Sequence, residues 1–242
     1  MNKFVDVLGI QFINISFFEM GRVIKENIKN NKKTFIVTAN PEIVMHSYEN
    51  ERYRNIVQSA HYVVPDGHGI LLASKLLKHP IEERIAGYDL MTHLLNEANQ
   101  EKWKVYLLGG KEEVNKKAVD RIQKQFPHLK LVGHHHGYFS LEDKEVPHEI
   151  HQLKPDLVFV ALGFPRQEEW IDHHFSTFDK GIFIGVGGSI DVLAGNVKRA
   201  PEFWQKIQLE WLYRLIQQPS RWRRMLALPK FLFKIVKVRN KH

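Results

Sequence analysis

Residues 104–126 read KVYLLGGKEEVNKKAVDRIQKQF, and this stretch decides the fold that the sequence predicts. An apolar run at 104–108 ends at Gly109-Gly110, and a charged amphipathic helix follows at 112–126 until Pro127 stops it. A short apolar strand that leads through glycines into an amphipathic helix is the repeating unit of a parallel α/β sheet. The stretch therefore predicts a strand that helices bury on both faces.

The same alternation extends in both directions from this unit. Further strands are predicted at 4–8, 34–39, 61–64, 129–132, 157–162 and 182–186. The segments between them have helical periodicity, with a capping box at Ser16 and Glu19 and a break between two helices near Asn50. The pattern predicts an α/β fold with a doubly wound, mostly parallel, Rossmann-like sheet, which forms a core over residues 1–197.

A basic amphipathic helical C-terminal appendage, residues 198–242, is predicted to follow this core. It has 12 Lys and Arg against two acidic residues, a net charge of +10 in a chain whose total is +8. Large apolar side chains separate the charges, and a helix with a basic face and an apolar face is typical of segments that lie in the plane of a membrane. A helix docked on its own core, or one that binds nucleic acid, is an alternative. The density of aliphatic and aromatic residues after residue 222 favours an anionic membrane surface and no nucleic acid.

Several classes of protein are excluded by what the sequence lacks. It has no cysteine, which excludes disulfides and thiolate metal sites. It has no run of 18 apolar residues and no signal-peptide pattern, so we expect a cytoplasmic protein that binds the inner face of the cell membrane peripherally. G-x-x-x-x-G-K-[ST], G-x-G-x-x-G and the cation-holding D-x-D are also absent. The run at 134–136 is interpreted as a loop, because consecutive histidines do not share a face. We expect no metal cofactor.

Binding residues are expected where strands end, because ligands of parallel sheets bind beyond the carboxyl ends of the strands. Glycines follow three of the predicted strands, at Gly109-Gly110, Gly163 and Gly187-Gly188. Their backbone N–H groups can approach a phosphate, although each glycine can also serve a tight turn alone. Taken together, these loops predict a site for a phosphorylated ligand at one edge of the sheet.

Six short motifs occur in order, at residues 37–42, 65–69, 83–87, 163–168, 185–189 and 198–201. Together they resemble the WecG/TagA/CpsF glycosyltransferases over about residues 4–238, and most of all the branch that acts in wall teichoic acid synthesis. The resemblance implies an inverting, β-1,4-forming transfer of N-acetylmannosamine from its UDP donor to N-acetylglucosamine-diphospho-undecaprenol. It also implies self-association of the globular part into a homo-oligomer. Alternatives are a sibling-branch transferase that uses another UDP-sugar and a non-catalytic module that binds nucleotide sugars or anionic lipid.

The chemistry of such a transfer fits the polar residues of these motifs. An inverting transfer needs a base for the proton of the acceptor hydroxyl, and Asp66, in a turn after a strand, is the predicted base. A turn-capping carboxylate is the alternative for this residue. Thr38, Asn40 and Gln167 are neutral hydrogen-bonding groups, suited to sugar hydroxyls and an acetamido group.

Cationic side chains are predicted to stabilise the leaving diphosphate in place of a metal ion. Arg84 lies in the core, and three further candidates lie in the appendage, which would complete the site by folding over the strand ends. The predicted catalytic residues are Asp66, Arg84 and Gln167. The predicted substrate-binding residues are Thr38, Asn40, Gly109, Gly110, Gly163, Glu168, Gly187, Gly188, Arg214, Arg221 and Arg224.

Overall fold

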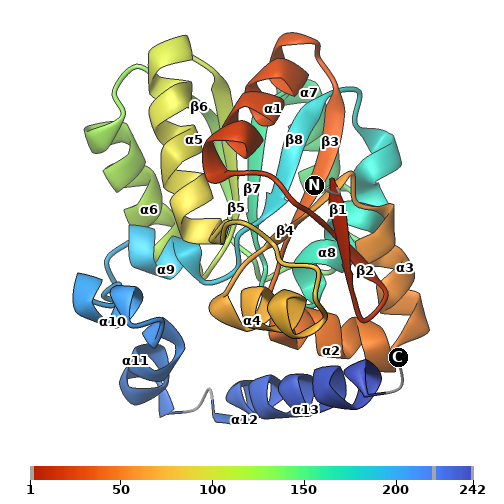
Figure 1. Ribbon diagram of the computed structural model, residues 1–242. Helices are drawn as coiled ribbons and strands as arrows, with labels where there is room; N and C mark the ends of the chain where they lie inside the picture. The colour runs from red at the N-terminus through yellow and green to blue at the C-terminus, as the bar shows by residue number, and fades with distance from the viewer. Residues whose placement is uncertain (1–2, 220–221, 241–242) are drawn as a thin grey trace.

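The structure is a computed structural model that describes residues 3–219 and 222–240. Its main sheet has the strand order β4-β3-β8-β7-β5-β6 (Figure 1). The strands are β3 (Lys33–Ala39), β4 (Tyr62–Pro65), β5 (Lys104–Gly109), β6 (Lys130–His135), β7 (Leu157–Ala161) and β8 (Gly181–Gly185). Each neighbouring pair is parallel, which confirms the predicted sheet.

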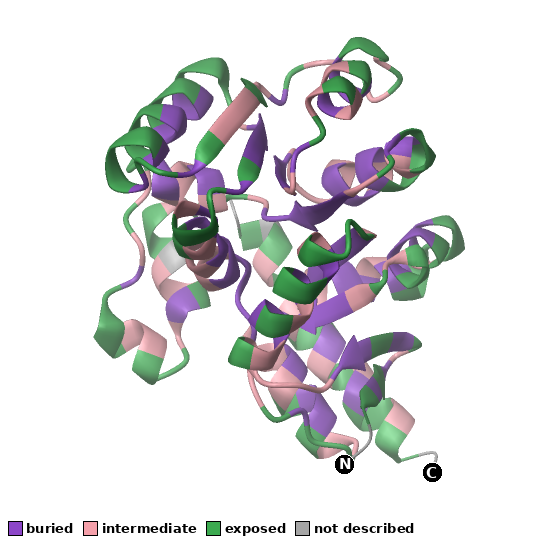
Figure 2. Cartoon of the chain, turned by 90° about the horizontal axis from the view of Figure 1, so that it is seen from above, coloured by how far each residue is buried: buried purple, intermediate pink, exposed green. Residues whose placement is uncertain are grey.

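Helices cover both faces of the sheet, as expected for strands that are apolar throughout. One face packs against α1 (Phe17–Lys29), α5 (Gly87–Glu101), α6 (Glu112–Gln125) and α9 (Ser189–Leu193). The other packs against α2 (Pro41–Glu49), α3 (Glu51–Ser59), α4 (His68–Leu76), α7 (Glu145–Leu153), α8 (Arg166–His174) and a 3-10 turn at Phe175–Thr177. Figure 2 shows the buried residues in the strands and on the inner sides of these helices.

Local sequence signals set several helix ends. The Ser16 hydroxyl accepts a hydrogen bond from the Glu19 N–H (3.2 Å), and the Glu19 carboxylate accepts one from the Ser16 N–H (2.9 Å). This confirms the predicted capping box at the start of α1. The Asn50 side chain accepts from the Tyr53 N–H (3.0 Å) and begins α3, which confirms the predicted break between two helices.

The N-terminal strand belongs to a separate hairpin, not to the main sheet. β1 (Phe4–Val7) pairs antiparallel with β2 (Ile10–Ile13), a strand that the sequence analysis missed. The turn between them uses left-handed backbone at Leu8 (φ 54°) and Gly9 (φ 88°), as tight hairpin turns require. Gly9 between two short apolar runs was the available signal for the hairpin.

The appendage is helical and lies across the carboxyl ends of the strands, at the bottom of Figure 1. Its helices are α10 (Glu202–Lys206), α11 (Glu210–Gln217), α12 (Trp222–Met225) and α13 (Ala227–Arg239). Helix α13 packs against α2 and α4. Phe231 and Ile235 are fully buried there and join the same apolar cluster as the inner residues of α2 and α4. The appendage therefore shares the core of the protein instead of forming a core of its own.

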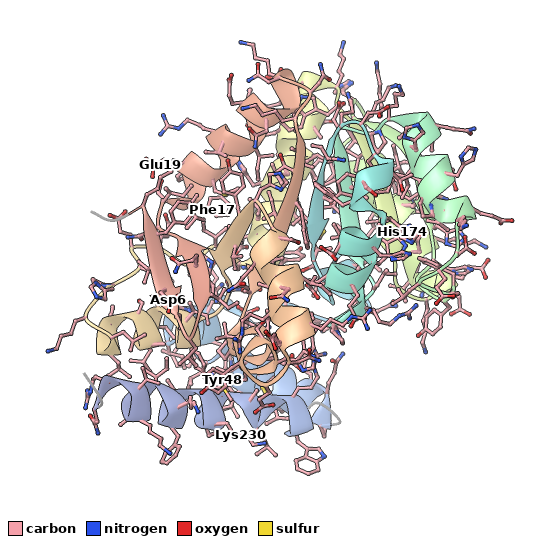
Figure 3. The ribbon with its side chains drawn as sticks, turned by 90° about the vertical axis from the view of Figure 1, so that its right-hand side faces the viewer. Asp6, Phe17, Glu19, Tyr48, His174 and Lys230 are labelled. Carbon is pink, nitrogen blue, oxygen red and sulfur yellow. The ribbon has the colours of Figure 1, made fainter. Side chains whose placement is uncertain are left out.

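The opposite face of α13 is exposed and combines apolar with basic residues. Phe233 is 73% exposed and Val236 is 37% exposed, and Lys230 and Lys237 lie beside them at helical spacing. Figure 3 shows this helix as an outer layer of the molecule, with Lys230 on it. Among the described residues, no helix is long and apolar enough to cross a membrane.

Phe231 and Phe233 form a matched pair that tests the packing of α13. Phe231→Ala removes a fully buried ring, so we expect it to lower the free energy of unfolding by about 3–5 kcal/mol. Phe233→Ala removes a ring that is mostly exposed and is expected to change it by less than about 0.5 kcal/mol. Urea unfolding of both variants measures the difference. Equal, small effects would show that α13 does not pack on the core in solution.

Candidate active site

A cavity of about 520 Å³ lies between the carboxyl ends of the strands and the appendage. Loops after β3, β4, β7 and β8 form its core wall, and segments from α10 to α13 form the facing wall. Nine predicted site residues line it, namely Thr38, Asn40, Asp66, Arg84, Gly163, Gln167, Gly187, Gly188 and Arg224. Gly109, Gly110 and Glu168 do not line it. Arg221 lies outside the described residues, and the side chain of Arg214 is not described.

Asp66 stands in the turn that joins β4 to α4. Its N–H donates to the Ala39 carbonyl at the end of β3 (2.9 Å), so the sheet fixes the backbone of this residue. Gly67 follows with φ +102°, which favours glycine, and α4 starts at the next residue. A Cβ on Gly69 would meet a methyl carbon of Leu228 at 2.8 Å, so the absent side chain lets the appendage approach the Asp66 turn.

His68 is a cavity residue that the sequence analysis did not assign, although it occupies the variable position of the motif at 65–69. Burial lowers the pKa of its imidazole, and the positive charge of Arg84 lowers it further, against an opposite effect of Glu210. The imidazole is therefore neutral near pH 7, where it can exchange a proton or donate a hydrogen bond.

Thr38 is near the end of β3 and Asn40 follows that strand, and both side chains already make hydrogen bonds within the protein. The Thr38 hydroxyl donates to the Gly185 carbonyl at the end of β8 (2.8 Å). The Asn40 side-chain oxygen accepts from the backbone N–H groups of Glu42 (2.9 Å) and Ile43 (3.1 Å) and so caps α2. The cap leaves the Asn40 NH2 group, a pair of donors, as the part of this side chain that suits a ligand.

The described arginines of the cavity wall are each paired with a carboxylate. Arg84 lies 3.5 Å from Glu210 of the appendage and 3.7 Å from Asp89. Arg224 of the appendage makes a bidentate pair with Glu42 of the core, with a shortest distance of 2.8 Å. Two ion pairs thus cross the cavity in opposite senses, one with its cation on the core and one with its cation on the appendage.

Arg199, which belongs to the motif at 198–201, adds a third cation to the cavity wall. It was not among the predicted site residues. Its guanidinium contacts Asp89 at 2.6 Å and lies over the ring of Tyr88, 5.0 Å from the centroid. Asp89 is thereby shared between Arg84 and Arg199. Asp89 and Glu210 balance the charges of these two arginines, and a diphosphate can replace the carboxylates as their partner.

Gln167 and Glu168 begin α8, and the two side chains form a buried hydrogen-bonded pair. The Gln167 amide nitrogen donates to Glu168 Oε1 (2.6 Å), and the Gln167 amide oxygen accepts from the Gly187 N–H (2.9 Å). Glu168 is fully buried and also accepts from the Tyr53 hydroxyl (3.1 Å). Glu168 was predicted to contact substrate, but the structure places it behind the cavity wall.

Gly109 and Gly110, predicted to approach a phosphate, lie away from the cavity. A Cβ on Gly109 would collide with the backbone of Ala161, so the residue permits close packing of β5 on β7. The Gly110 N–H already donates to the Ala161 carbonyl (3.1 Å). The tight-turn interpretation, which the sequence analysis kept as the alternative, accounts for both glycines.

The histidine run at 134–136 was interpreted as a loop, but His134 and His135 belong to β6. The His134 Nδ1 lies 2.7 Å from the side-chain oxygen of Asn115, and the His135 Nδ1 lies 2.8 Å from the His136 carbonyl. No group of three or more His, Asp or Glu side chains within residues 3–219 and 222–240 is placed to hold a metal ion. The run therefore serves the local structure of the strand.

The fold and the cavity define an α/β protein with a ligand site at the carboxyl edge of a parallel sheet. At this edge a carboxylate, neutral hydrogen-bonding groups and cations face one cavity, which suits an anionic sugar derivative. The chain belongs to the glycosyl transferase WecG/TagA/CpsF family, whose model matches residues 5–242. This confirms the resemblance that the six motifs indicated.

Two relatives carry the same name, N-acetylglucosaminyldiphosphoundecaprenol N-acetyl-beta-D-mannosaminyltransferase. The chain is 44% identical to that of Bacillus spizizenii strain W23 over 210 residues, which are 87% of this chain and 81% of that protein. It is 41% identical to that of Staphylococcus aureus strain MRSA252 over 239 residues, which are 98% of this chain and 94% of that protein. The second similarity spans the core and the appendage together.

The buried carboxyl of Glu168 gives the folded protein a testable dependence on pH. Burial raises its pKa to about 7, so the folded state holds this proton more tightly than the unfolded chain does. The resulting stabilisation is present at low pH and is lost as the pH rises through about 7. Relative to Glu168→Gln, the wild-type free energy of unfolding is expected to fall by roughly 2–3 kcal/mol between about pH 5 and pH 8. Urea unfolding across this pH range measures the free energy of unfolding of both proteins. The prediction would be contradicted if the two proteins showed the same dependence on pH.

Proposed function

We propose that this protein transfers N-acetylmannosamine from UDP-N-acetylmannosamine to N-acetylglucosamine-diphospho-undecaprenol, as an early step in the synthesis of the wall teichoic acid linkage unit. The observation that carries the proposal is the similarity to transferases of that name over 98% of the chain. The cavity supports it, because it brings a carboxylate, hydrogen-bonding side chains and arginines together. Each of these groups has a role in the transfer of a sugar from a nucleoside diphosphate without a metal ion.

In the proposed reaction Asp66 is the general base. Its carboxylate takes the proton of the acceptor hydroxyl, whose oxygen attacks the anomeric carbon from the face opposite the UDP group. The bond between that carbon and the phosphate oxygen breaks, and UDP leaves with the bonding electrons. This displacement inverts the anomeric centre and forms the β linkage.

The arginines are proposed to stabilise the charge that develops on the leaving diphosphate, without a metal cofactor. Arg84 and Arg224 line the cavity from opposite walls, and Arg199 lies beside Arg84 on Asp89. A diphosphate that displaces Glu42 and Glu210 exchanges one anionic partner for another, so no arginine is left unpaired. Arg214 and Arg221 stay assigned to this role from the sequence alone, as cations of the appendage.

We further propose that the exposed face of α13 lies on the anionic inner surface of the cell membrane. Phe233, Val236, Lys230 and Lys237 form this face, and Leu228 on the inner side of the same helix lines the cavity. A polyprenyl chain in the membrane would thus have its diphosphate near the arginines. Homo-oligomerisation through the globular part is proposed on the family resemblance.

The alternatives are a transferase for another UDP-sugar and a module that binds without catalysis. An assay of UDP release separates them, because a catalyst releases UDP fastest when its own donor and the lipid acceptor are both present. A binding module releases none under any combination. Binding of a DNA or RNA probe with a steep dependence on salt would instead indicate a nucleic-acid partner.

Asp66→Asn tests the assignment of the base. We expect kcat to fall by roughly 10²–10⁴-fold, the usual effect of a lost general base, while the affinity for UDP stays close to that of the wild type. Steady-state UDP release and calorimetric titration with UDP measure the two quantities. A variant that keeps more than half of the wild-type turnover would transfer the role to another group, with His68 of the same turn as the first candidate.

Two phenylalanines of equal exposure test the membrane surface. Phe233 on α13 is 73% exposed, and Phe18 is 72% exposed on α1, which packs on the other face of the sheet. Because a buried phenyl ring contributes roughly 1.5–3 kcal/mol, Phe233→Ser should weaken binding to anionic vesicles by about tenfold or more. Phe18→Ser should leave vesicle sedimentation unchanged. Equal effects of the two substitutions, or none from Phe233→Ser, would remove α13 from the membrane surface.

A further inference from the structure

The amide of Gln167 has both of its polar ends engaged within the protein. Its nitrogen donates to Glu168 Oε1 (2.6 Å), and its oxygen accepts from the Gly187 N–H (2.9 Å). If the amide were turned over, its NH2 would face the N–H of Gly187, and two donors would meet without an acceptor. An ionised Glu168 can accept hydrogen bonds but cannot donate any, so it selects the orientation in which the Gln167 NH2 faces Glu168 and the Gln167 oxygen holds Gly187.

Glu168 is itself held from the other side. It is fully buried, and its second oxygen accepts from the hydroxyl of Tyr53 (3.1 Å), which is 1% exposed. The Tyr53 ring packs edge-on against the rings of Phe164 and His46, with centroids 5.5 Å and 4.8 Å away. A Cβ on Gly185 would meet the Gln167 amide nitrogen at 2.7 Å, so the end of β8 leaves space for this arrangement.

The loop held in this way is part of the cavity wall. Gly187 (φ +50°) and Gly188 line the cavity on the core side, next to Thr38, whose hydroxyl fixes the preceding strand end at the Gly185 carbonyl. The facing wall is largely apolar and comes from the appendage, with Ile207, Met225, Leu228 and Leu232. The apolar wall suits the lipid acceptor, so the polar wall with the glycine loop suits the UDP-sugar donor.

We propose that Glu168 is a positioning residue for the donor, acting through Gln167 on the Gly187–Gly188 loop. The proposal rests on the proposed transfer from a UDP-sugar. Gln167, predicted from sequence to contact the sugar, then acts mainly as the link between Glu168 and the loop. An unpaired polar atom in this network would let the wall shift, and a misplacement of about 1 Å in a reactive geometry costs on the order of 10²-fold in rate.

The charge state of Glu168 changes the strength of the hydrogen bonds that fix the Gly187–Gly188 loop through Gln167. Burial raises its pKa to about 7, and the neighbouring Glu169 adds to the effect, while the hydrogen bonds from Gln167 and Tyr53 oppose it. Other titratable groups around this carboxyl are Tyr53, His46, which contacts the Tyr53 ring, and Glu42, whose charge also acts on Tyr53. Hydrogen bonds to an ionised carboxylate are about twice as strong as neutral ones, so the loop is held more firmly above pH 7 than below it.

The test compares Glu168→Gln with Glu168→Met in the full-length protein. Glutamine can still accept from Gln167 and donate to the Tyr53 oxygen, whereas methionine has a similar size and offers Gln167 no comparable acceptor. We expect Glu168→Met to lower kcat/KM for the UDP-sugar donor about 10–100-fold, with a raised donor KM, and to leave the KM for the lipid acceptor unchanged. Glu168→Gln should keep a donor KM near that of the wild type but lose the fall in KM that the wild type shows from about pH 6 to pH 8.

Asn27→Leu is the control for a purely structural loss. Asn27 is also buried and donates to the Thr34 hydroxyl (3.2 Å), but it lies on α1, outside the cavity wall. Asn27→Leu should lower the free energy of unfolding without changing the KM for the donor or the KM for the acceptor. If Glu168→Met does not fold, Tyr53→Phe removes one bond to Glu168 and is expected to raise the donor KM in the same direction by a smaller factor.

Binding of UDP alone separates this inference from the proposed function. Calorimetric titration should give a weaker Kd for UDP in Glu168→Met than in the wild type, whether or not transfer is observed with a given acceptor. A wild type that binds UDP but transfers no sugar would overturn the proposed function only. An unchanged donor KM and UDP affinity in folded Glu168→Met, or an equal rise in donor and acceptor KM, would overturn the positioning role.

Discussion

Parallel pairing of β3 with both β4 and β8 is the constraint on which the site depends, because it places three strand ends side by side. The end of β3 accepts the N–H of Asp66, and the end of β8 accepts the hydroxyl of Thr38. Asp66 and Thr38, two residues of the cavity wall, are therefore fixed by hydrogen bonds to the strand ends of the sheet. The core wall is preorganised before any ligand enters, which lowers the cost of ordering it on binding.

The appendage wall is attached by a different kind of interaction. Phe231 and Ile235 bury apolar surface between α2 and α4. The Arg224–Glu42 pair is partly exposed, whereas the Arg84–Glu210 pair is largely buried, with side chains 16% and 12% exposed. An exposed ion pair contributes little to stability, and the desolvation cost of a buried pair offsets much of its attraction, so the apolar contacts hold the appendage in place. The ion pairs instead determine where the arginines lie, and an entering diphosphate can take over each cation from its carboxylate.

Much of this arrangement could be predicted from sequence, because strand periodicity and strand-end loops are local signals. Asp66 and Asn40 follow predicted strands and were assigned on that basis, and they line the cavity. The roles of Glu168 and Gly109 could not be predicted in this way. Glu168 meets Tyr53 from a distant helix, and Gly109 is required by the backbone of a neighbouring strand. Both depend on which elements become neighbours, which periodicity along the chain does not encode.

The same limit applies to α13, where apolar residues occupy two faces of one helix. Phe231 packs inward and Phe233, two residues later, points outward, a distinction that depends on the helix being docked. Because α13 also carries Leu228 on the cavity wall, a membrane that binds its outer face restrains the inner face as well. Binding energies coupled through one element are reciprocal. With the proposed membrane surface on its outer face, α13 would couple the two sites: a ligand in the cavity against Leu228 would change membrane binding by the same factor by which the membrane changes the binding of that ligand.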